Sequence, residues 1–221
     1  MDASPSSSSY LPQWNCDVLL SFRGEDTCKK FVDHLYMALQ QKGIHTFKDD
    51  EKLQRGKSIA SELLKAIKES KFAIIIFSKN YASSSWCLDE LVEIIKYRNK
   101  VGQKILPIFY NVDLSQVRKQ NESFAEAFAK HEENFGDDME KVQKWTAALV
   151  EAAYLSGWDL NDVANGHEAK FIQKIVQEII KKLDHIPLYV AKYEVVIDSR
   201  VNKVIALLNN GSKDAILVSR K

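Results

Sequence analysis

The chain has 221 residues, 45% of them hydrophobic, and its 31 basic and 30 acidic residues leave a formal charge of +1. This length suffices for one domain with an extension, and the near-neutral charge does not indicate nucleic acid or an anionic membrane surface as a partner. No apolar stretch approaches the roughly 20 residues that span a bilayer, and residues 1–13 are serine-rich and lack the features of a secretory signal. We therefore expect no membrane contact, a disordered leader over residues 1–13, and a cytoplasmic or nuclear location.

The three cysteines, Cys16, Cys28 and Cys87, have neither a zinc-ligand spacing nor the even number of a disulfide framework. Reduced thiols in a reducing compartment are the simplest interpretation. The histidines form no metal-binding cluster in the sequence, so we expect no metal and no bound cofactor.

Apolar runs alternate with segments of helical period along most of the chain, which is the pattern of βαβ units around a parallel sheet. We predict strands at residues 17–22, 44–47, 72–78 and 105–110, with a weak one at 155–160. Helices are expected at residues 27–42, 58–70, 85–99, 124–133, 139–154 and 167–183. Residues 72–77 are apolar on both faces, which predicts the middle strand of the sheet. The expected fold is α/β, a flavodoxin-like three-layer sandwich with a five-stranded parallel sheet.

The first predicted strand runs directly into a polar loop that opens a helix. Residues 21–28 of this junction read Ser-Phe-Arg-Gly-Glu-Asp-Thr-Cys. The carboxyl ends of strands in an open α/β sheet are where ligands bind, so this loop is a candidate binding element.

A second informative segment, residues 83–91, reads Ser-Ser-Ser-Trp-Cys-Leu-Asp-Glu-Leu. Serine is a good N-cap, so a helix should begin near Ser85 with Trp86 in its first turn. A buried stripe is predicted at i, i+3, i+4 and i+7, formed by Leu88, Leu91, Val92 and Ile95. At about 100° per residue, Glu90 then lies nearly opposite this stripe and about 40° from Trp86. By itself Glu90 is either a solvated carboxylate or a site residue that shares a face with an aromatic ring.

These two segments and the charged loop at residues 47–58 resemble the motifs of plant-type TIR (Toll/interleukin-1 receptor) domains, and the resemblance covers about residues 14–184. In that family the glutamate of the S-x-W-C-x-x-E-L box is the catalytic residue for NAD cleavage, so the resemblance implies that Glu90 is catalytic. It implies substrate binding by Arg23, Gly24, Glu25, Asp26, Thr27, Cys28, Gly56 and Trp86. Cys28 stands where the family usually has a second arginine, and a neutral thiol should bind a nucleotide less tightly than a guanidinium.

The resemblance also implies self-association. The loop at residues 50–56 resembles the BB loop, which shapes the nucleotide pocket and packs against a neighbouring protomer, although a charged turn with Gly56 explains the same residues. His34 matches a position that packs across a helix interface, whereas Asp33 replaces the usual serine. The self-association residues implied in this way are His34, Asp33, Asp50, Leu53 and Arg55.

The family resemblance further indicates how the chain is divided. Residues 185–221 follow a helix stop at Pro187 and resemble the linker and the truncated start of a nucleotide-binding module. No P-loop motif is present in the sequence, so we expect a TIR-only product that resembles the N-terminal part of TIR-type nucleotide-binding leucine-rich-repeat immune receptors.

Two functions remain open at this point. The first is an NAD hydrolase in plant immune and cell-death signalling. It would cleave NAD to nicotinamide and ADP-ribose-type products when the chain associates with copies of itself or with other TIR domains. The alternative is a non-enzymatic interaction module, or adaptor, that oligomerises with receptor TIR domains. A phosphoacceptor receiver domain shares the topology, but Ser78 stands where it needs an aspartate at the end of the central strand.

Overall fold

The computed structural model describes residues 14–27, 31–48 and 61–184. Of two compact units in the chain, the first ends at Lys181 and contains the whole sheet. Only the last residues of the final helix are described in the second unit.

The centre of the molecule is a parallel sheet in the order β2-β1-β3-β4-β5. The strands are β1 (Cys16–Phe22), β2 (Thr46–Lys48), β3 (Ser70–Phe77), β4 (Lys104–Phe109) and β5 (Trp158–Asp159). Residues from Phe72 to Phe77 of β3 are at most 2% exposed, and β3 pairs with β1 on one side and β4 on the other. The predicted five-stranded sheet and its middle strand are therefore confirmed.

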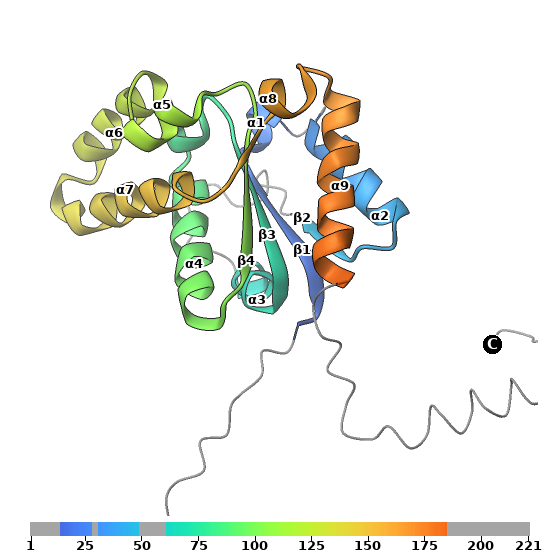
Figure 1. The fold of residues 1–221 in the computed structure, drawn as a ribbon. Coiled ribbons are helices and arrows are strands. Elements are labelled where there is room, and N and C mark those ends of the chain that lie inside the picture. Colours follow the sequence, from blue (N-terminus) through green and yellow to red (C-terminus); the bar gives the residue numbers. More distant parts are fainter. Residues whose placement is uncertain (1–13, 28–30, 49–60, 185–221) are drawn as a thin grey trace, which may run out of the picture. The chain divides into compact units, whose positions relative to one another are not determined.

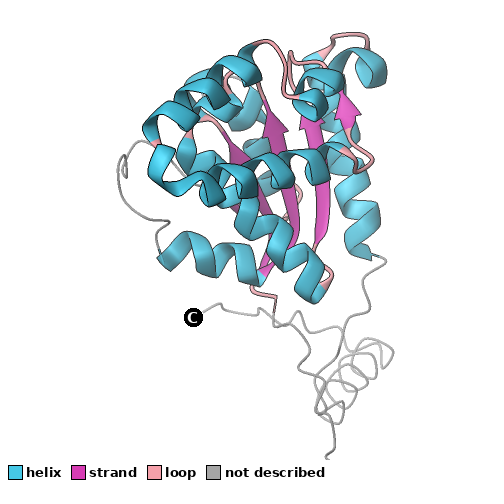
Figure 2. Cartoon of the chain, turned by 90° about the vertical axis from the view of Figure 1, so that its left-hand side faces the viewer, coloured by secondary structure: helices cyan, strands magenta, loops and turns pink. Residues whose placement is uncertain are grey.

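Helices cover both faces of this sheet (Figure 1). On one face lie α2 (Asp33–Gln41) and α9 (Glu168–Asp184), where Phe31 stacks on Phe171 with ring centroids 5.9 Å apart. On the other, α3 (Ser61–Glu69) and α4 (Ser85–Val101) pack together, and α7 (Met139–Ala153) packs along α4. Figure 2 shows the strands side by side, with their carboxyl ends at one edge.

The remaining elements are one helix of 12 residues, α6, and several short ones. They comprise α1 (Gly24–Thr27), η3 (Tyr81–Ser83), α5 (Leu114–Lys119), α6 (Ser123–Asn134), η4 (Gly136–Asp138) and α8 (Leu160–Ala164). The helix predicted at 124–133 corresponds to α6, but α5 and α8 were not predicted, because five or six residues are too few to give a periodic apolar pattern.

Two predicted elements have different bounds in the structure. The helix predicted at residues 27–42 is described in two parts, the turn α1, which ends at Thr27, and α2 from Asp33; residues 28–30 between them lie outside the described residues. The Thr27 hydroxyl donates to the carbonyl of Arg23 at 2.9 Å, which fixes that turn locally. The weak strand predicted at 155–160 shrinks to two residues, because the Asp159 side chain accepts from the backbone N–H groups of Asn161 and Asp162 and so starts α8.

No helix in the described part of the chain is both long enough and apolar enough to span a bilayer. Within the same residues, no group of three or more histidine, cysteine, aspartate or glutamate side chains is arranged to hold a metal ion.

Candidate active site

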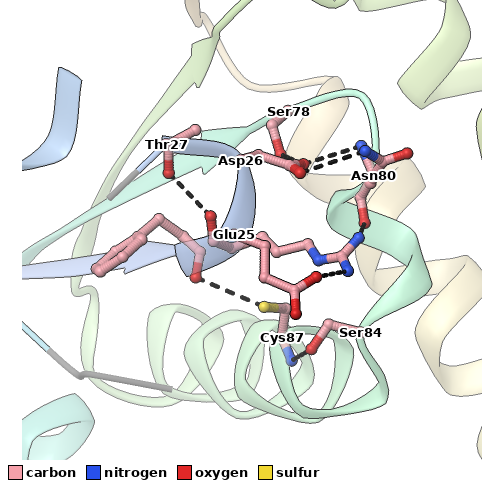
Figure 3. A network of polar contacts seen from close by, with 9 residues as sticks. Glu25, Asp26, Thr27, Ser78, Asn80, Ser84 and Cys87 are labelled. Carbon is pink, nitrogen blue, oxygen red and sulfur yellow. Dashed lines mark hydrogen bonds and ion pairs between the residues drawn. The ribbon is translucent and has the colours of Figure 1, made fainter. Parts of the chain in front are cut away.

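The candidate site lies where the chain leaves β1 and β3 at the carboxyl edge of the sheet. These two strands are neighbours, but β1 leads to β2 on one side and β3 leads to β4 on the other. Such a change of direction separates the loops and is where open α/β sheets bind ligands. The turn α1, the loop after β3 and the start of α4 meet at this point (Figure 3).

The side chain of Asp26 joins the first two of these segments. Its carboxylate accepts from the Ser78 hydroxyl at 2.6 Å, from the backbone N–H of Asn80 at 3.1 Å and from the Asn80 side-chain amide at 3.2 Å (Figure 3). Ser78, at the position where a receiver domain would carry its aspartate, is 2% exposed and acts as a donor in this network. Asp26 is therefore a structural link between the loops that follow β1 and β3.

Arg23 reinforces that link. Its Nη1 donates to the carbonyl of Asn80 at 2.8 Å, and its Nη2 forms an ion pair of 2.6 Å with Glu25. A guanidinium has five N–H groups, so these two contacts leave it further donors. The sequence predicted only ligand binding for Arg23 and not these contacts, which join it to the loop after β3 and to Glu25.

The start of α4 is fixed against the end of β1. The Ser84 hydroxyl accepts from the backbone N–H of Cys87 at 3.2 Å, which confirms the predicted serine N-cap and places Trp86 in the first turn. The Cys87 thiol lies 3.5 Å from the carbonyl of Phe22, and the Tyr81 hydroxyl donates to the carbonyl of Cys87 at 3.2 Å. Ser78, Asn80 and Tyr81 are contacts that sequence reasoning missed, because only the strand order brings them to the first loop.

Glu90 is buried, with 2% of its surface exposed. The expectation that it lies on the face opposite the core is therefore wrong. The buried side of α4 is broader than the predicted stripe, since sheet and helices cover it on several sides, and it comprises Cys87, Leu88, Glu90, Leu91, Ile94 and Ile95. Val92, which was assigned to the stripe, is only half-buried. Glu90 lies three residues after Cys87, and this spacing could have indicated its burial.

Among the acidic residues that the structure describes, Glu90 alone is buried. A carboxylate is costly to remove from water, and apolar residues would fill the same position more cheaply. Glu90 lies in the second turn of α4, beyond the first turn in which the helix dipole acts strongly. Trp86 is half-buried one turn earlier and packs against the core cluster. An acidic group kept at such a position is typical of a functional site.

Two of the residues implied in self-association, Asp33 and His34, lie at the start of α2, on the face of the sheet opposite α4. Asp33 forms an ion pair of 2.7 Å with Lys48, so its carboxylate is held within the chain. The side chain of His34 is 68% exposed, with Nδ1 3.3 Å from the carboxylate of Glu168. The Tyr110 hydroxyl donates to the same carboxylate at 3.1 Å, and burial together with the negative charge of Glu168 raises the pKa of Tyr110.

The structure describes some of the other predicted site residues but not all of them. Gly24 is half-buried in α1, and Glu25 is exposed. Cys28, Asp50, Leu53, Arg55 and Gly56 lie outside the described residues, as does the predicted extension at 185–221.

Comparison with known proteins gives a consistent result. The family described as "TIR domain" matches residues 15–198. TMV resistance protein N of Nicotiana glutinosa is 50% identical over 205 residues, which is 93% of this chain and 18% of that protein. Disease resistance protein RPV1 of Vitis rotundifolia is 49% identical over 217 residues, which is 98% of this chain and 15% of that protein. The chain thus spans less than a fifth of the length of these relatives.

A solved structure is also similar. The TIR domains of the activated Roq1 resistosome, which directly recognises the pathogen effector XopQ, align with a TM-score of 0.70 and 57% sequence identity, over 74% of this chain and 99% of that one. The sheet order and the helical layers described above therefore correspond to a known architecture.

Proposed function

Because this chain belongs to the TIR domain family, we propose that it is an NAD hydrolase that releases nicotinamide and an ADP-ribose-type product. The observation that supports this proposal most directly is the burial of Glu90, three residues along α4 from Cys87, whose thiol contacts the carbonyl of Phe22 at the end of β1. The relatives of this chain are plant disease-resistance proteins, and we therefore propose that the activity serves immune and cell-death signalling.

A single carboxylate is sufficient for this reaction. The bond between nicotinamide and ribose breaks to release a neutral base from a cationic pyridinium, so the leaving group needs no proton, unlike that of an ordinary glycoside. Positive charge then develops on the ribosyl carbon. A carboxylate fixed in a water-poor environment stabilises or captures that centre more strongly than one in solvent. In this proposal Glu90 supplies that carboxylate and Trp86 supplies a surface on which a ring can stack.

Substrate binding is proposed at the loop after β1. Arg23 has N–H groups beyond the two used by Asn80 and Glu25, and a guanidinium suits the phosphates of a dinucleotide. The contacts of Asp26 with Ser78 and Asn80 hold this loop in one conformation, which reduces the ordering cost of binding.

We also propose that activity requires self-association. His34 is exposed, and the structure named for the Roq1 resistosome concerns TIR domains within an assembly. Activity per molecule should therefore rise with the local concentration of the chain.

The experiment compares wild type with Glu90→Gln and the matched control Glu93→Gln, each purified and held at high local concentration. Glu93 is on the same helix, but its carboxylate forms a partly exposed pair with Lys96 at 3.1 Å. Glu93→Gln should cleave NAD at the wild-type rate, and Glu90→Gln should be slower by at least about a hundredfold, the loss expected for a transition-state charge stabiliser. Urea denaturation checks that both variants fold.

Equal NAD loss by wild type and Glu90→Gln would refute the enzymatic proposal. If neither protein cleaved NAD but both self-associated, and if His34→Ala abolished that association, the result would instead support the interaction module.

A further inference from the structure

The segment that carries Trp86 and Glu90 contacts the rest of the protein on two sides. On the sheet side, Cys87 reaches the carbonyl of Phe22 at the end of β1. On the outer side, α6 packs against η3, which lies immediately before the N-cap of α4. A change in the position of η3 would therefore change where α4 begins.

His131, on α6, makes a hydrogen bond across this outer contact. Its Nε2 lies 2.8 Å from the carbonyl oxygen of Ala82 in η3, and both residues are buried, at 7% and 1% exposure. A carbonyl oxygen only accepts hydrogen bonds, so Nε2 must carry the proton. This bond is thus a directed contact between α6 and the residue two positions before the α4 N-cap.

Three aromatic rings hold the imidazole in its orientation. The centroid of the His131 ring is 4.9 Å from that of Trp145, 6.0 Å from Phe135 and 6.1 Å from Phe128. Close packing on several sides leaves the ring few alternative rotamers. Nε2 is therefore aimed at Ala82 by the surrounding packing.

One of these rings, that of Trp145, also contacts α4 itself. Trp145 donates from Nε1 to a carboxylate oxygen of Asp89 at 2.8 Å, and Lys141 pairs with the other oxygen at 3.0 Å. Asp89 immediately precedes Glu90. The α6 and α7 helices thus hold the segment at Ala82, before the helix begins, and again at Asp89 within it.

We propose that His131 is a positioning residue for Glu90. It acts through Ala82 and η3 to set the start of α4, and it touches neither substrate nor reacting atoms. The proposal rests on the NAD-cleaving function proposed above. A carboxylate that stabilises developing charge must be placed to within a fraction of an ångström, so a small displacement of α4 should lower kcat while KM changes little.

Two substitutions separate the hydrogen bond from the packing. His131→Phe keeps an aromatic ring and removes the donor, whereas His131→Gln loses the ring and keeps an N–H at about the reach of Nε2. Each variant is assayed for kcat and KM on NAD. The proposal predicts that His131→Phe lowers kcat by roughly tenfold, because the unpaired Ala82 carbonyl lets η3 and the start of α4 shift, and that His131→Gln stays within about threefold of wild type.

A second measurement does not depend on activity. Cys87 is fully buried in the first turn of α4, so its thiol reacts with a labelling reagent only when this segment opens. Labelling resolved by peptide mapping should be about tenfold faster at Cys87 in His131→Phe than in wild type and nearly unchanged in His131→Gln. Labelling at Cys16, which is buried in β1, provides the internal reference for global unfolding.

The outcomes are distinct. A wild-type chain that cleaves no NAD defeats the proposed function, while the Cys87 labelling rates still decide whether His131 holds the segment. If His131→Phe matches wild type in both measurements, or if His131→Gln is the more impaired variant, His131 contributes packing alone and the positioning role is wrong.

Discussion

The carboxylate of Asp26, in the loop after β1, accepts three hydrogen bonds from the loop after β3. Replacing Asp26 with alanine removes the acceptor for the Ser78 hydroxyl and for two donors of Asn80. Because these bonds involve a charged, partly buried acceptor, we expect Asp26→Ala to lower the free energy of unfolding by about 2 kcal/mol. Urea denaturation measures the change. The control Asp137→Ala removes an exposed carboxylate from η4 and should stay within about 0.5 kcal/mol of wild type; equal loss in both would contradict a linking role for Asp26.

The hydroxyl of Tyr110 makes stability depend on pH at the alkaline end. Burial and the charge of Glu168 raise the pKa of Tyr110 above its ordinary value of 10.0. A group whose pKa is raised on folding stabilises the protein fully below its unfolded pKa and loses that contribution as pH rises through the folded value. Wild type should therefore be more stable than Tyr110→Phe at pH 8, and the difference should shrink as pH rises above about 10. Denaturation curves across this pH range measure the difference in the free energy of unfolding between wild type and Tyr110→Phe, and Tyr154→Phe, at an exposed tyrosine, is the control. A difference that stays constant with pH would show that Tyr110 does not titrate in this way.

The sequence singled out Glu90 as a site residue but did not predict its burial. The family motif singled out this glutamate, and the serine N-cap placed Trp86 correctly in the first turn of α4. The burial of Glu90 was missed because a carboxylate was assumed to face solvent, as most carboxylates do. The contacts of Arg23 and Asp26 with Asn80 were also beyond reach, since they join residues more than fifty positions apart.

At the scale of elements, the long segments were predicted well and the short ones poorly. The apolar runs of β1, β3 and β4 and the periodic patterns of α4, α7 and α9 gave bounds within about two residues of those observed. Elements that local side chains define, such as α1, α5 and α8, were missed. Asp159 illustrates the reason: its capping bonds end β5 after two residues, and hydrophobic periodicity does not register such a contact.

The approach to β5 gives a prediction at this scale. A Cβ added at Gly157 would lie 2.5 Å from a ring carbon of Phe109 and 3.0 Å from the carbonyl oxygen of Pro107, both on β4. Gly157→Ala should therefore displace β5 from β4 and lower the free energy of unfolding by about 1–3 kcal/mol. Gly136→Ala is the matched control, because nothing lies within 4 Å of its added Cβ. Equal urea midpoints for the two variants would contradict the close approach at Gly157.

For the whole molecule, the alternation of strands and helices sufficed to predict the doubly wound sheet. The one strand that is apolar on both faces was correctly predicted to be the middle of the sheet. Self-association could not be derived in the same way. It depends on surfaces such as the one around His34, and an exposed histidine beside a glutamate is compatible with many contacts or none.

The central claim is that NAD cleavage depends on Glu90 and on association of the chain with itself. The most direct test is the rate of nicotinamide release from NAD, measured over a wide range of protein concentration for wild type and Glu90→Gln. The account predicts that the wild-type rate rises more steeply than protein concentration and that Glu90→Gln releases about a hundredfold less at every concentration. Equal release by the two proteins, or no release by wild type even at the highest concentration, would contradict it.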